Sequence, residues 1–358
     1  MGILDLVRGR RHSPLIGLDV SSSGVKLVEL GQNASGDFVL ERFASENFDR
    51  GWITDGQIEN FEAVVDAVRR AVAKSGTKTR DVALAMPQSA VITKKIVLPG
   101  GLRDEELELQ VEAEANQYIP FSLDEVALDF CVIGPSSGST DDVDVLIAAS
   151  RKDRVQDRQG LAEAAGLKPV ILDVESYASR MAIGRLTSSK TGAADALLAL
   201  FEIGAETTSL KVLRGDELIY DRDQAFGGSQ LTHQISKVFG YSYEEAEIKK
   251  ISGGLPEDYP STVLKPFVET LSQEIGRALQ YFFTSTPHHK VNYVMLAGGT
   301  ASLPGLHEKV KDLTGFACSV VNPFDGMKMG AAVREAKLKK EASSYLTACG
   351  LAMRRYFR

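Results

Sequence analysis

The sequence predicts an α/β protein whose two related lobes share a nucleotide pocket, and three segments carry that prediction. In residues 16–30, an apolar run ends at Asp19, passes through a small polar turn and resumes as an alternating strand. Residues 196–213 repeat this arrangement around Glu202, so each half of the chain has one acid-ended hairpin. A third apolar run ends in the turn Gly298-Gly299-Thr300. Strand and helix patterns that alternate around such segments are typical of an α/β fold.

The first hairpin has the residue types of a phosphate site. Backbone N–H groups at a tight turn can converge on an anion, and serine hydroxyls add donors without bulk. Lys26 adds a positive charge, and Asp19 suits a hydrated magnesium ion, which takes oxygen ligands and keeps several waters. The alternative interpretation is an ordinary serine-rich hairpin. The candidate binding residues are Ser21, Ser22, Ser23 and Lys26, with Asp19 as a metal ligand.

The second hairpin is expected to clamp a phosphate chain from the opposite side. Its candidates are Glu202, as a second metal ligand, and Gly204, Thr207 and Thr208 in the polar turn. In the third segment, glycines let the backbone approach a flat ring or a sugar closely, although Gly-Gly turns are common. We therefore assign Gly298, Gly299 and Thr300 to the nucleoside side of the pocket.

Composition limits the class of protein without identifying it. The 358 residues are 44% apolar and 25% charged, which is enough for two lobes with sizeable cores. A net charge of −7 argues against nucleic acid as the main partner. The three cysteines are widely separated and lack metal spacing, which favours a reduced cytoplasmic protein. No run of residues predicts a transmembrane helix, and no Gly-Lys dipeptide offers a P-loop.

Periodicity predicts helices and strands between the two hairpins. Residues 59–75 and 103–118 place apolar side chains at helical spacing, and strands are expected at 126–133 and 143–149. The polar face of 103–118 is acidic, a pattern that usually marks a solvated surface. At the C-terminus, burial of Leu351 and Met353 is favoured over a membrane-bound amphipathic helix. The acidic face consists of Glu105, Glu106, Glu108, Glu112 and Glu114.

The order and spacing of the three segments resemble those of actin-like ATPases, the class of actin, sugar kinases and Hsp70. The resemblance implies ATP and Mg²⁺ as cofactors. It implies a helix at residues 243–250 that holds adenosine, with Glu247 on the ribose or base and Lys250 beside the adenine. Glu175, in the link between the lobes, would face magnesium or the attacking water and is the candidate catalytic residue. Gly227 and Gly228 would touch the ribose or the phosphates.

Within this class, the chain is similar to the PilM family of type IV pilus assembly proteins, which are relatives of the division protein FtsA. The similar blocks lie at residues 1–6, 17–19, 23–30, 112–121, 165–169, 172–176 and 350–354. The resemblance implies an FtsA-like plan in which a 1C subdomain is inserted into the first lobe. It implies an N-terminal tail at residues 1–13 and a first lobe, called 1A, formed by residues 14–99 and 170–193 with subdomain 1C inserted at 100–169. The second lobe, called 2A/2B, would span residues 194–335, and residues 336–358 would close the fold.

Two residues depart from the pattern that the resemblance implies. The superfamily usually has aspartate where Glu202 stands and a small residue where Glu206 follows Ala205. Glutamate reaches one methylene further, and Glu206 brings negative charge close to the expected phosphates. Because phosphoryl transfer depends on positioning and charge stabilisation, we expect ATP binding with slow or absent hydrolysis. A small-molecule kinase and a filament-forming ATPase of the same superfamily are the alternatives.

The resemblance also implies a partner and a location. PilM relatives grip the N-terminal cytoplasmic tail of the membrane protein PilN in a groove between 1A and 1C, which here would draw on residues 103–121. Other inner-membrane and motor components of the pilus are further candidate partners, and nucleic acid is not. The implied location is cytoplasmic and peripheral to the inner membrane, with the membrane contacted through partners.

Overall fold

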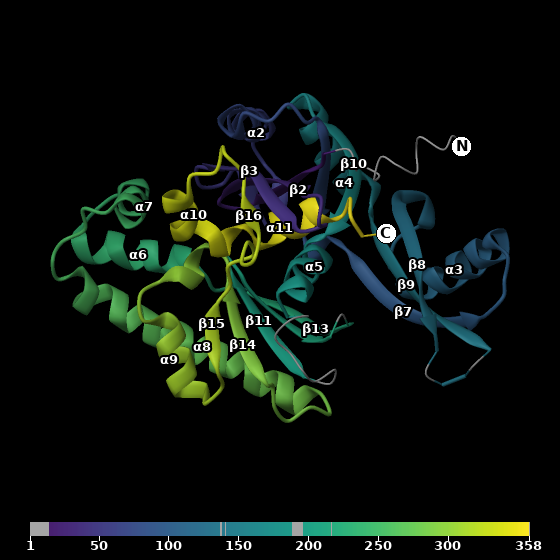
Figure 1. The fold of residues 1–358 in the computed structure, drawn as a ribbon. Coiled ribbons are helices and arrows are strands. Elements are labelled where there is room, and N and C mark those ends of the chain that lie inside the picture. The colour runs from purple at the N-terminus through teal and green to yellow at the C-terminus, as the bar shows by residue number, and fades with distance from the viewer. Residues whose placement is uncertain (1–13, 137, 140, 188–195, 216, 358) are drawn as a thin grey trace.

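Two sheets of the same topology form the body of the molecule (Figure 1). The computed structural model describes residues 14–136, 138–139, 141–187, 196–215 and 217–357. The first sheet has the order β10-β6-β1-β2-β3-β16 and the second β13-β12-β11-β14-β15. In each sheet, three consecutive strands form an antiparallel meander. The first strand of that meander also pairs in parallel with a strand that comes later in the sequence. This repeat confirms the prediction of two related α/β lobes.

The first sheet is covered on one face by α2 and α4. Helix α2 (Phe61–Ser75) begins where the Asn60 side chain accepts a hydrogen bond from the N–H of Ala63 and ends at left-handed Gly76. Its valines at helical spacing pack on strand residues such as Leu18. The strands are β1 (Ile16–Ser21), β2 (Gly24–Gln32), β3 (Phe38–Asn47), β6 (Asp81–Met86), β10 (Lys168–Val174) and β16 (Lys328–Met329), and α4 spans Lys152–Ala164.

The second sheet packs on α6 and α8. Phe201 and Phe267 are fully buried in this core, because the apolar side of each element faces the other. The strands are β11 (Leu197–Ile203), β12 (Thr208–Arg214), β13 (Glu217–Gln224), β14 (Tyr293–Ala297) and β15 (Cys318–Val320). The helices are α6 (Gly228–Phe239), α7 (Tyr243–Ser252), α8 (Lys265–Ser285), α9 (Leu306–Thr314) and α10 (Glu335–Glu341).

A separate three-stranded sheet projects from the first lobe at the right of Figure 1. It consists of β7 (Ile92–Pro99), β8 (Val126–Pro135) and β9 (Asp142–Arg151), with α3 (Asp104–Tyr118) packed on it. Its bounds differ from the predicted 100–169. Strand β7 pairs along its whole length with β9, whereas α4 and β10 belong to the first lobe. The inserted unit therefore spans 92–151, a pairing that local sequence patterns did not reveal.

Helices α5 (Glu175–Thr187) and α11 (Leu346–Met353) lie between the two lobes (Figure 1). Leu351 and Met353 are buried there, which confirms the expectation for the C-terminus. Close approach depends on glycine, because a Cβ on Gly350 would lie 1.8 Å from the carbonyl oxygen of Ala178. The C-terminal segment is thus part of the core that joins the lobes.

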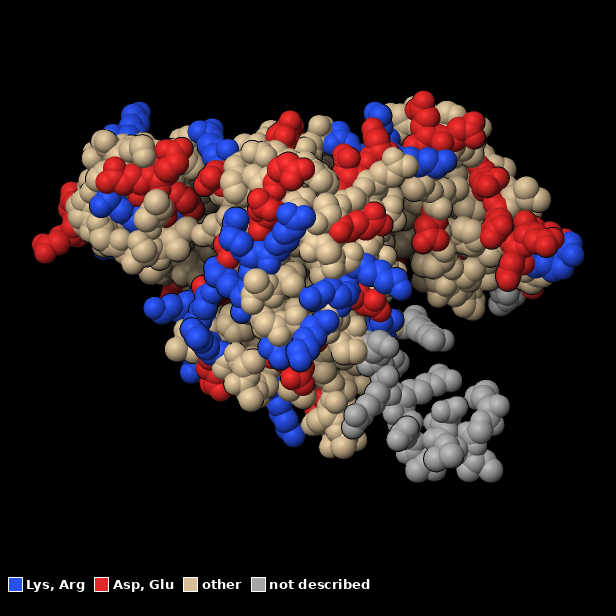
Figure 2. Space-filling model, turned by 90° about the horizontal axis from the view of Figure 1, so that it is seen from above, with Lys and Arg blue, Asp and Glu red and all other residues tan. Residues whose placement is uncertain are grey.

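Charge is distributed unevenly over the surface. Figure 2 shows acidic side chains at both ends of the molecule, including the end where the inserted unit lies, and Lys and Arg side chains gathered in the middle of the same face. On α3, Glu105, Glu108 and Glu112 are exposed, as expected for a solvated helix face. None of the helices in the described ranges combines the length and apolarity needed to cross a membrane.

Candidate nucleotide site

The first predicted hairpin is formed by β1 and β2, with Ser22 and Ser23 at its tip. Antiparallel register places Lys26 opposite Asp19, and its Nζ lies 3.8 Å from Asp19 Oδ2 and 3.4 Å from Ser21 Oγ. Burial raises the pKa of Asp19, an effect that Lys26 opposes and Glu202 reinforces. The structure thus brings a lysine and a carboxylate together beside a serine turn, as the sequence predicted.

The second hairpin contains a buried ion pair that the sequence did not reveal. Lys211 on β12 reaches Glu202 Oε2 and donates a hydrogen bond to Ser209 Oγ at 2.9 Å. The other oxygen, Glu202 Oε1, accepts hydrogen bonds from Ser179 Oγ at 3.0 Å and Thr347 Oγ1 at 3.3 Å. Burial alone would lower the pKa of Lys211, but the hydrogen bond to Glu202 and the combined attraction of Glu202, Asp221 and Asp223 outweigh burial and raise it. Glu202, predicted as a metal ligand, therefore has both oxygens engaged.

Three turns meet at the carbonyl oxygen of Gly204. This oxygen accepts hydrogen bonds from the N–H of Gly228 and from Thr300 Oγ1, each at 2.9 Å. The close fit explains the glycines, since a Cβ on Gly227 would lie 2.5 Å from the Ala205 oxygen. Gly298 has a φ of 93° and leaves no room for a Cβ, whereas Gly299 faces open space. The predicted glycines, which come from three segments far apart in the sequence, thus lie together around the carbonyl oxygen of Gly204.

The two predicted threonines of the second hairpin have different surroundings. Thr208 is buried and its Oγ1 donates to the carbonyl oxygen of Phe226 at 2.6 Å, so this hydroxyl ties the hairpin to the Gly227 turn. Thr207 is exposed at the tip, where its carbonyl oxygen accepts the N–H of Gly204 at 2.8 Å. Of the two threonines, only Thr207 has a side chain in the open part of the turn.

Helix α7 brings Glu247 and Lys250 together, as their spacing predicted. Lys250 Nζ lies 2.6 Å from Glu247 Oε2 and donates to Thr232 Oγ1 on α6 at 2.7 Å. Nζ is also 3.5 Å from the carbonyl oxygen of Gly228, so this cluster adjoins the glycine turns. At the start of α7, the ring of Tyr243 lies 5.0 Å from the guanidinium of Arg50, which reaches across from the first lobe.

The candidate catalytic residue, Glu175, lies at the start of α5 among charged groups. Loss of surrounding water raises the pKa of its carboxyl to about 8, Asp19 adds to the increase, and Arg158 opposes it. Arg158 is a further residue that the sequence did not indicate. Its guanidinium is buried and donates to the carbonyl oxygens of Val20 at 3.0 Å and Gly56 at 3.3 Å. It therefore carries a fixed positive charge behind the first hairpin.

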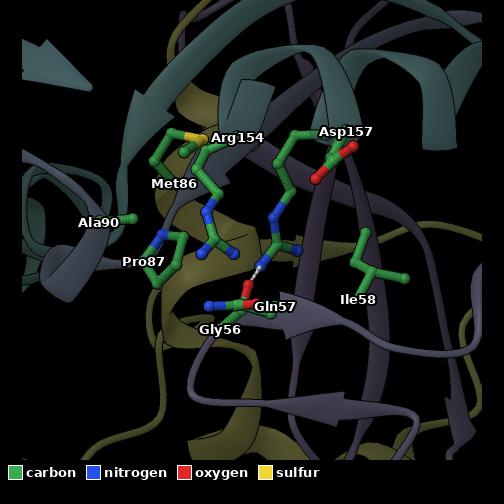
Figure 3. A pocket seen from close by; sticks show the side chains of 9 residues that line it. Gly56, Gln57, Ile58, Met86, Pro87, Ala90, Arg154 and Asp157 are labelled. Atoms are coloured by element: carbon green, nitrogen blue, oxygen red, sulfur yellow. Dashed lines mark hydrogen bonds between the residues drawn. The ribbon is translucent and has the colours of Figure 1, made fainter. Parts of the chain in front are cut away.

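A narrow slot lies in the first lobe, beside the segments that lead into and out of the inserted unit (Figure 3). Its interior volume of about 10 Å³ has room for roughly one water molecule. Arg154 of α4 points into it, and Arg158 of the same helix lines it and donates to the carbonyl oxygen of Gly56, while Pro87 and Ala90 close the other side. Residues 103–121, which were expected to form a groove here, do not line this slot.

The site as described does not assemble a metal cage. Across the described segments, no group of three or more His, Cys, Asp or Glu side chains is placed to hold a metal ion. The two predicted ligands differ: the nearest ion-pair partner of Asp19 among the described residues is Lys26 at 3.8 Å, whereas Glu202 is held on both oxygens. Only Asp19 retains the free coordination that a hydrated ion needs.

Comparison with known proteins identifies the family. The family model for type IV pilus assembly protein PilM matches residues 17–356. The chain belongs to the PilM family. The PilM–PilN type IV pilus biogenesis complex contains a chain that aligns with a TM-score of 0.80 and 28% identity, covering 97% of this chain and 100% of the other.

More distant relatives share the actin-like architecture. The cell division protein FtsA of Enterococcus hirae is 23% identical over 346 residues, which is 84% of this chain and 76% of FtsA. The ethanolamine utilization protein EutJ of Carboxydothermus hydrogenoformans aligns with a TM-score of 0.57 and 16% identity, covering 95% of this chain and 89% of EutJ. The prediction of an FtsA-like, actin-like ATPase fold is confirmed.

Proposed function

We infer that this PilM-family chain binds ATP between its lobes and serves type IV pilus assembly by holding the cytoplasmic tail of a PilN-like membrane protein. Membership of the family supports the role in pilus assembly. Similarity to a chain of the PilM–PilN complex supports the partner, which would also place the protein at the inner membrane from the cytoplasmic side. Other pilus components remain candidates for additional contacts.

The convergence of three turns on Gly204 is the observation that carries nucleotide binding. These turns leave Gly299 facing open space, and Lys250 Nζ lies 3.5 Å from the carbonyl oxygen of Gly228 beside them. Lys26 pairs with Asp19, which is close enough to Glu202 of the second hairpin for the two carboxylates to affect each other. Backbone N–H groups and lysines suit phosphates, and a carboxylate on α7 suits ribose hydroxyls. When bound, magnesium would neutralise phosphate charge, and Asp19 is the residue placed to hold its water shell.

Substitution of Lys26 tests this proposal. A charge-assisted hydrogen bond contributes roughly 1.5–3 kcal/mol, so Lys26→Ala should weaken ATP binding by about tenfold or more. Lys168→Ala is the matched control, because Lys168 is exposed and lies on the edge strand β10, which is separated from β2 by two strands. Titration calorimetry with Mg-ATP measures both variants, and equal affinity for the two would remove Lys26 from the site.

Hydrolysis is expected to be slow or absent. A general base must be ionised, but a pKa of about 8 keeps the Glu175 carboxyl largely protonated at neutral pH. Glu202 is immobilised by Lys211, Ser179 and Thr347, so it is not free to orient water. Purified protein should leave ATP intact for many minutes. Phosphate release near the enzyme median of about 10 per second would contradict this expectation.

The slot between α4 and the turn before β7 is the candidate end of the groove for the partner tail. An extended peptide is held by backbone hydrogen bonds, with small pockets for alternate side chains. Arg154 supplies a charged donor there, and Met86 and Pro87 supply an apolar wall. The second candidate surface is the outer side of α3, where Leu109 is 68% exposed.

Binding of a synthetic peptide with the sequence of the cognate tail separates the two surfaces. Ala90→Trp should block the slot with a side chain much larger than its interior and weaken binding, whereas Leu109→Ser should weaken binding only if the α3 surface is used. Ile133→Ser, on exposed strand β8, is the control. Fluorescence anisotropy measures the affinities. If neither test variant differs from the control, the tail binds elsewhere.

A further inference from the structure

Lys211 is an unusual residue for the middle of an inter-lobe core. Only 4% of its surface is exposed, and lysine is almost never buried so completely unless it is paired. Strand register explains its direction. Lys211 lies two residues from Ser209, which is paired with Glu202, so Glu202, Ser209 and Lys211 face the same side of the sheet. That side faces α5 and α11 rather than solvent.

Four elements hold the Lys211–Glu202 pair. Lys211 and Ser209 come from β12 and Glu202 from β11, while Ser179 of α5 and Thr347 of α11 donate to the remaining carboxylate oxygen. The side chains of Lys211 and Glu202 are only 5% and 16% exposed. A buried pair with its remaining hydrogen bonds satisfied is costly to break from either side, since the other charge is left unpaired.

The pair occupies the place where the resemblance to actin-like ATPases puts a metal-linked carboxylate. The extra methylene of glutamate, relative to aspartate, extends this carboxylate towards Lys211. A divalent ion at Glu202 would have to displace a buried ammonium group that is held by Ser209 and attracted by Asp221 of the neighbouring strand. The residues present therefore do not fit a metal ion at Glu202.

We propose that Lys211 is a resident cation that neutralises Glu202, so that nucleotide binding in this chain does not depend on a divalent ion at that carboxylate. This inference rests on the proposed binding of ATP between the lobes. Lys211 acts through Glu202 and is a positioning residue, because its ammonium contacts the carboxylate and Ser209 in the core. Asp19 remains available for a hydrated ion, but ATP affinity does not depend on that ion.

The experiment compares ATP affinity with magnesium and with excess EDTA, using calorimetry on the full chain. For the natural protein, the two dissociation constants should be similar. Lys211→Met leaves Glu202 charged and unpaired, so ATP affinity in EDTA should fall by about tenfold or more relative to magnesium. Lys211→Met/Glu202→Gln removes both charges and should restore similar constants. Circular dichroism checks that each variant is folded. If the single variant unfolds, the comparison of the double variant with the natural protein in magnesium and in EDTA still tests the inference.

The outcomes separate this inference from the proposed function. If the natural protein binds ATP in magnesium but loses it in EDTA, the resident-cation inference is wrong while nucleotide binding stands. If the double variant stays as weak as the single one in EDTA, Lys211 contacts the phosphates directly and the inference also fails. Absence of ATP binding under both conditions would instead contradict the proposed function.

Discussion

Replacing Gly350 by alanine should destabilise the protein, because α11 crosses α5 at this residue without space for a side chain. The added Cβ would lie 1.8 Å from the Ala178 oxygen and 2.5 Å from its carbonyl carbon, both of them backbone atoms. Atoms in contact need about 3.5 Å, so α11 would have to retreat by roughly 1.5 Å. Overpacking of this kind costs about 3 kcal/mol, of which the better helix propensity of alanine offsets about 1 kcal/mol. We expect a net loss of about 2 kcal/mol.

Urea unfolding provides the measurement. Trp52 is the single tryptophan and packs on Phe48 in the first lobe, so its fluorescence reports that lobe while circular dichroism reports all helices. Gly160→Ala is the matched control, since Gly160 lies inside α4 with nothing near its added Cβ. The control should gain about 0.5–1 kcal/mol from helix propensity. If Gly350→Ala is as stable as this control, the inference that α5 and α11 cross too closely for a side chain at Gly350 is wrong.

Three further substitutions test the charges and the core. Loss of surrounding water raises the pKa of the Glu175 carboxyl from 4.5 to about 8, so the folded state holds this proton to a higher pH than the unfolded state does. The contribution of Glu175 to folding stability therefore falls as the pH rises from 4.5 to about 8. In thermal unfolding, Glu175→Gln should be as stable as the natural protein near pH 4.5 and more stable above about pH 8. Arg354→Met removes two hydrogen bonds to Asp173 and should cost about 1.5–3 kcal/mol in urea, whereas exposed Arg334→Met should cost little. Phe267→Ala opens the second core and should cost about 3–5 kcal/mol, against about 1 kcal/mol for half-exposed Tyr281→Ala, which loses the contact of its ring with Arg222.

Local patterns were sufficient for the hairpins, because an apolar run that ends at Asp19 or Glu202 is contiguous in the chain. The same holds for α7, where Glu247 and Lys250 are three residues apart and share a face. Two further members of the site depend on long-range contacts. Arg158 bonds a residue 138 positions away, and Thr347 bonds one 145 positions away. Nothing near either residue in the sequence marks it as part of a site.

Lys211 lies between these two cases. Its alternation with Ser209 along the strand is visible in the sequence, but its pairing with Glu202 follows only when the strand register is known. Alternation along β12 places Ser209 and Lys211 on one face, and the antiparallel pairing of β11 with β12 places Glu202 on the same face. The sequence alone does not fix which residues of two strands are opposite each other. The inserted unit was misplaced for a related reason, because β7 reads as another first-lobe strand until its pairing with β9 is seen.

One side chain belongs to both proposed binding sites, and this limits how variants can be interpreted. Arg158 donates to the carbonyl oxygen of Val20 at the end of β1 and also lines the slot beside Gly56. A substitution at Arg158 would leave acceptors unpaired at the nucleotide hairpin and alter the slot at the same time. Ala90 and Lys26 avoid this ambiguity, because among the described contacts each side chain belongs to one site alone. They are therefore the positions at which nucleotide binding and tail binding can be tested separately.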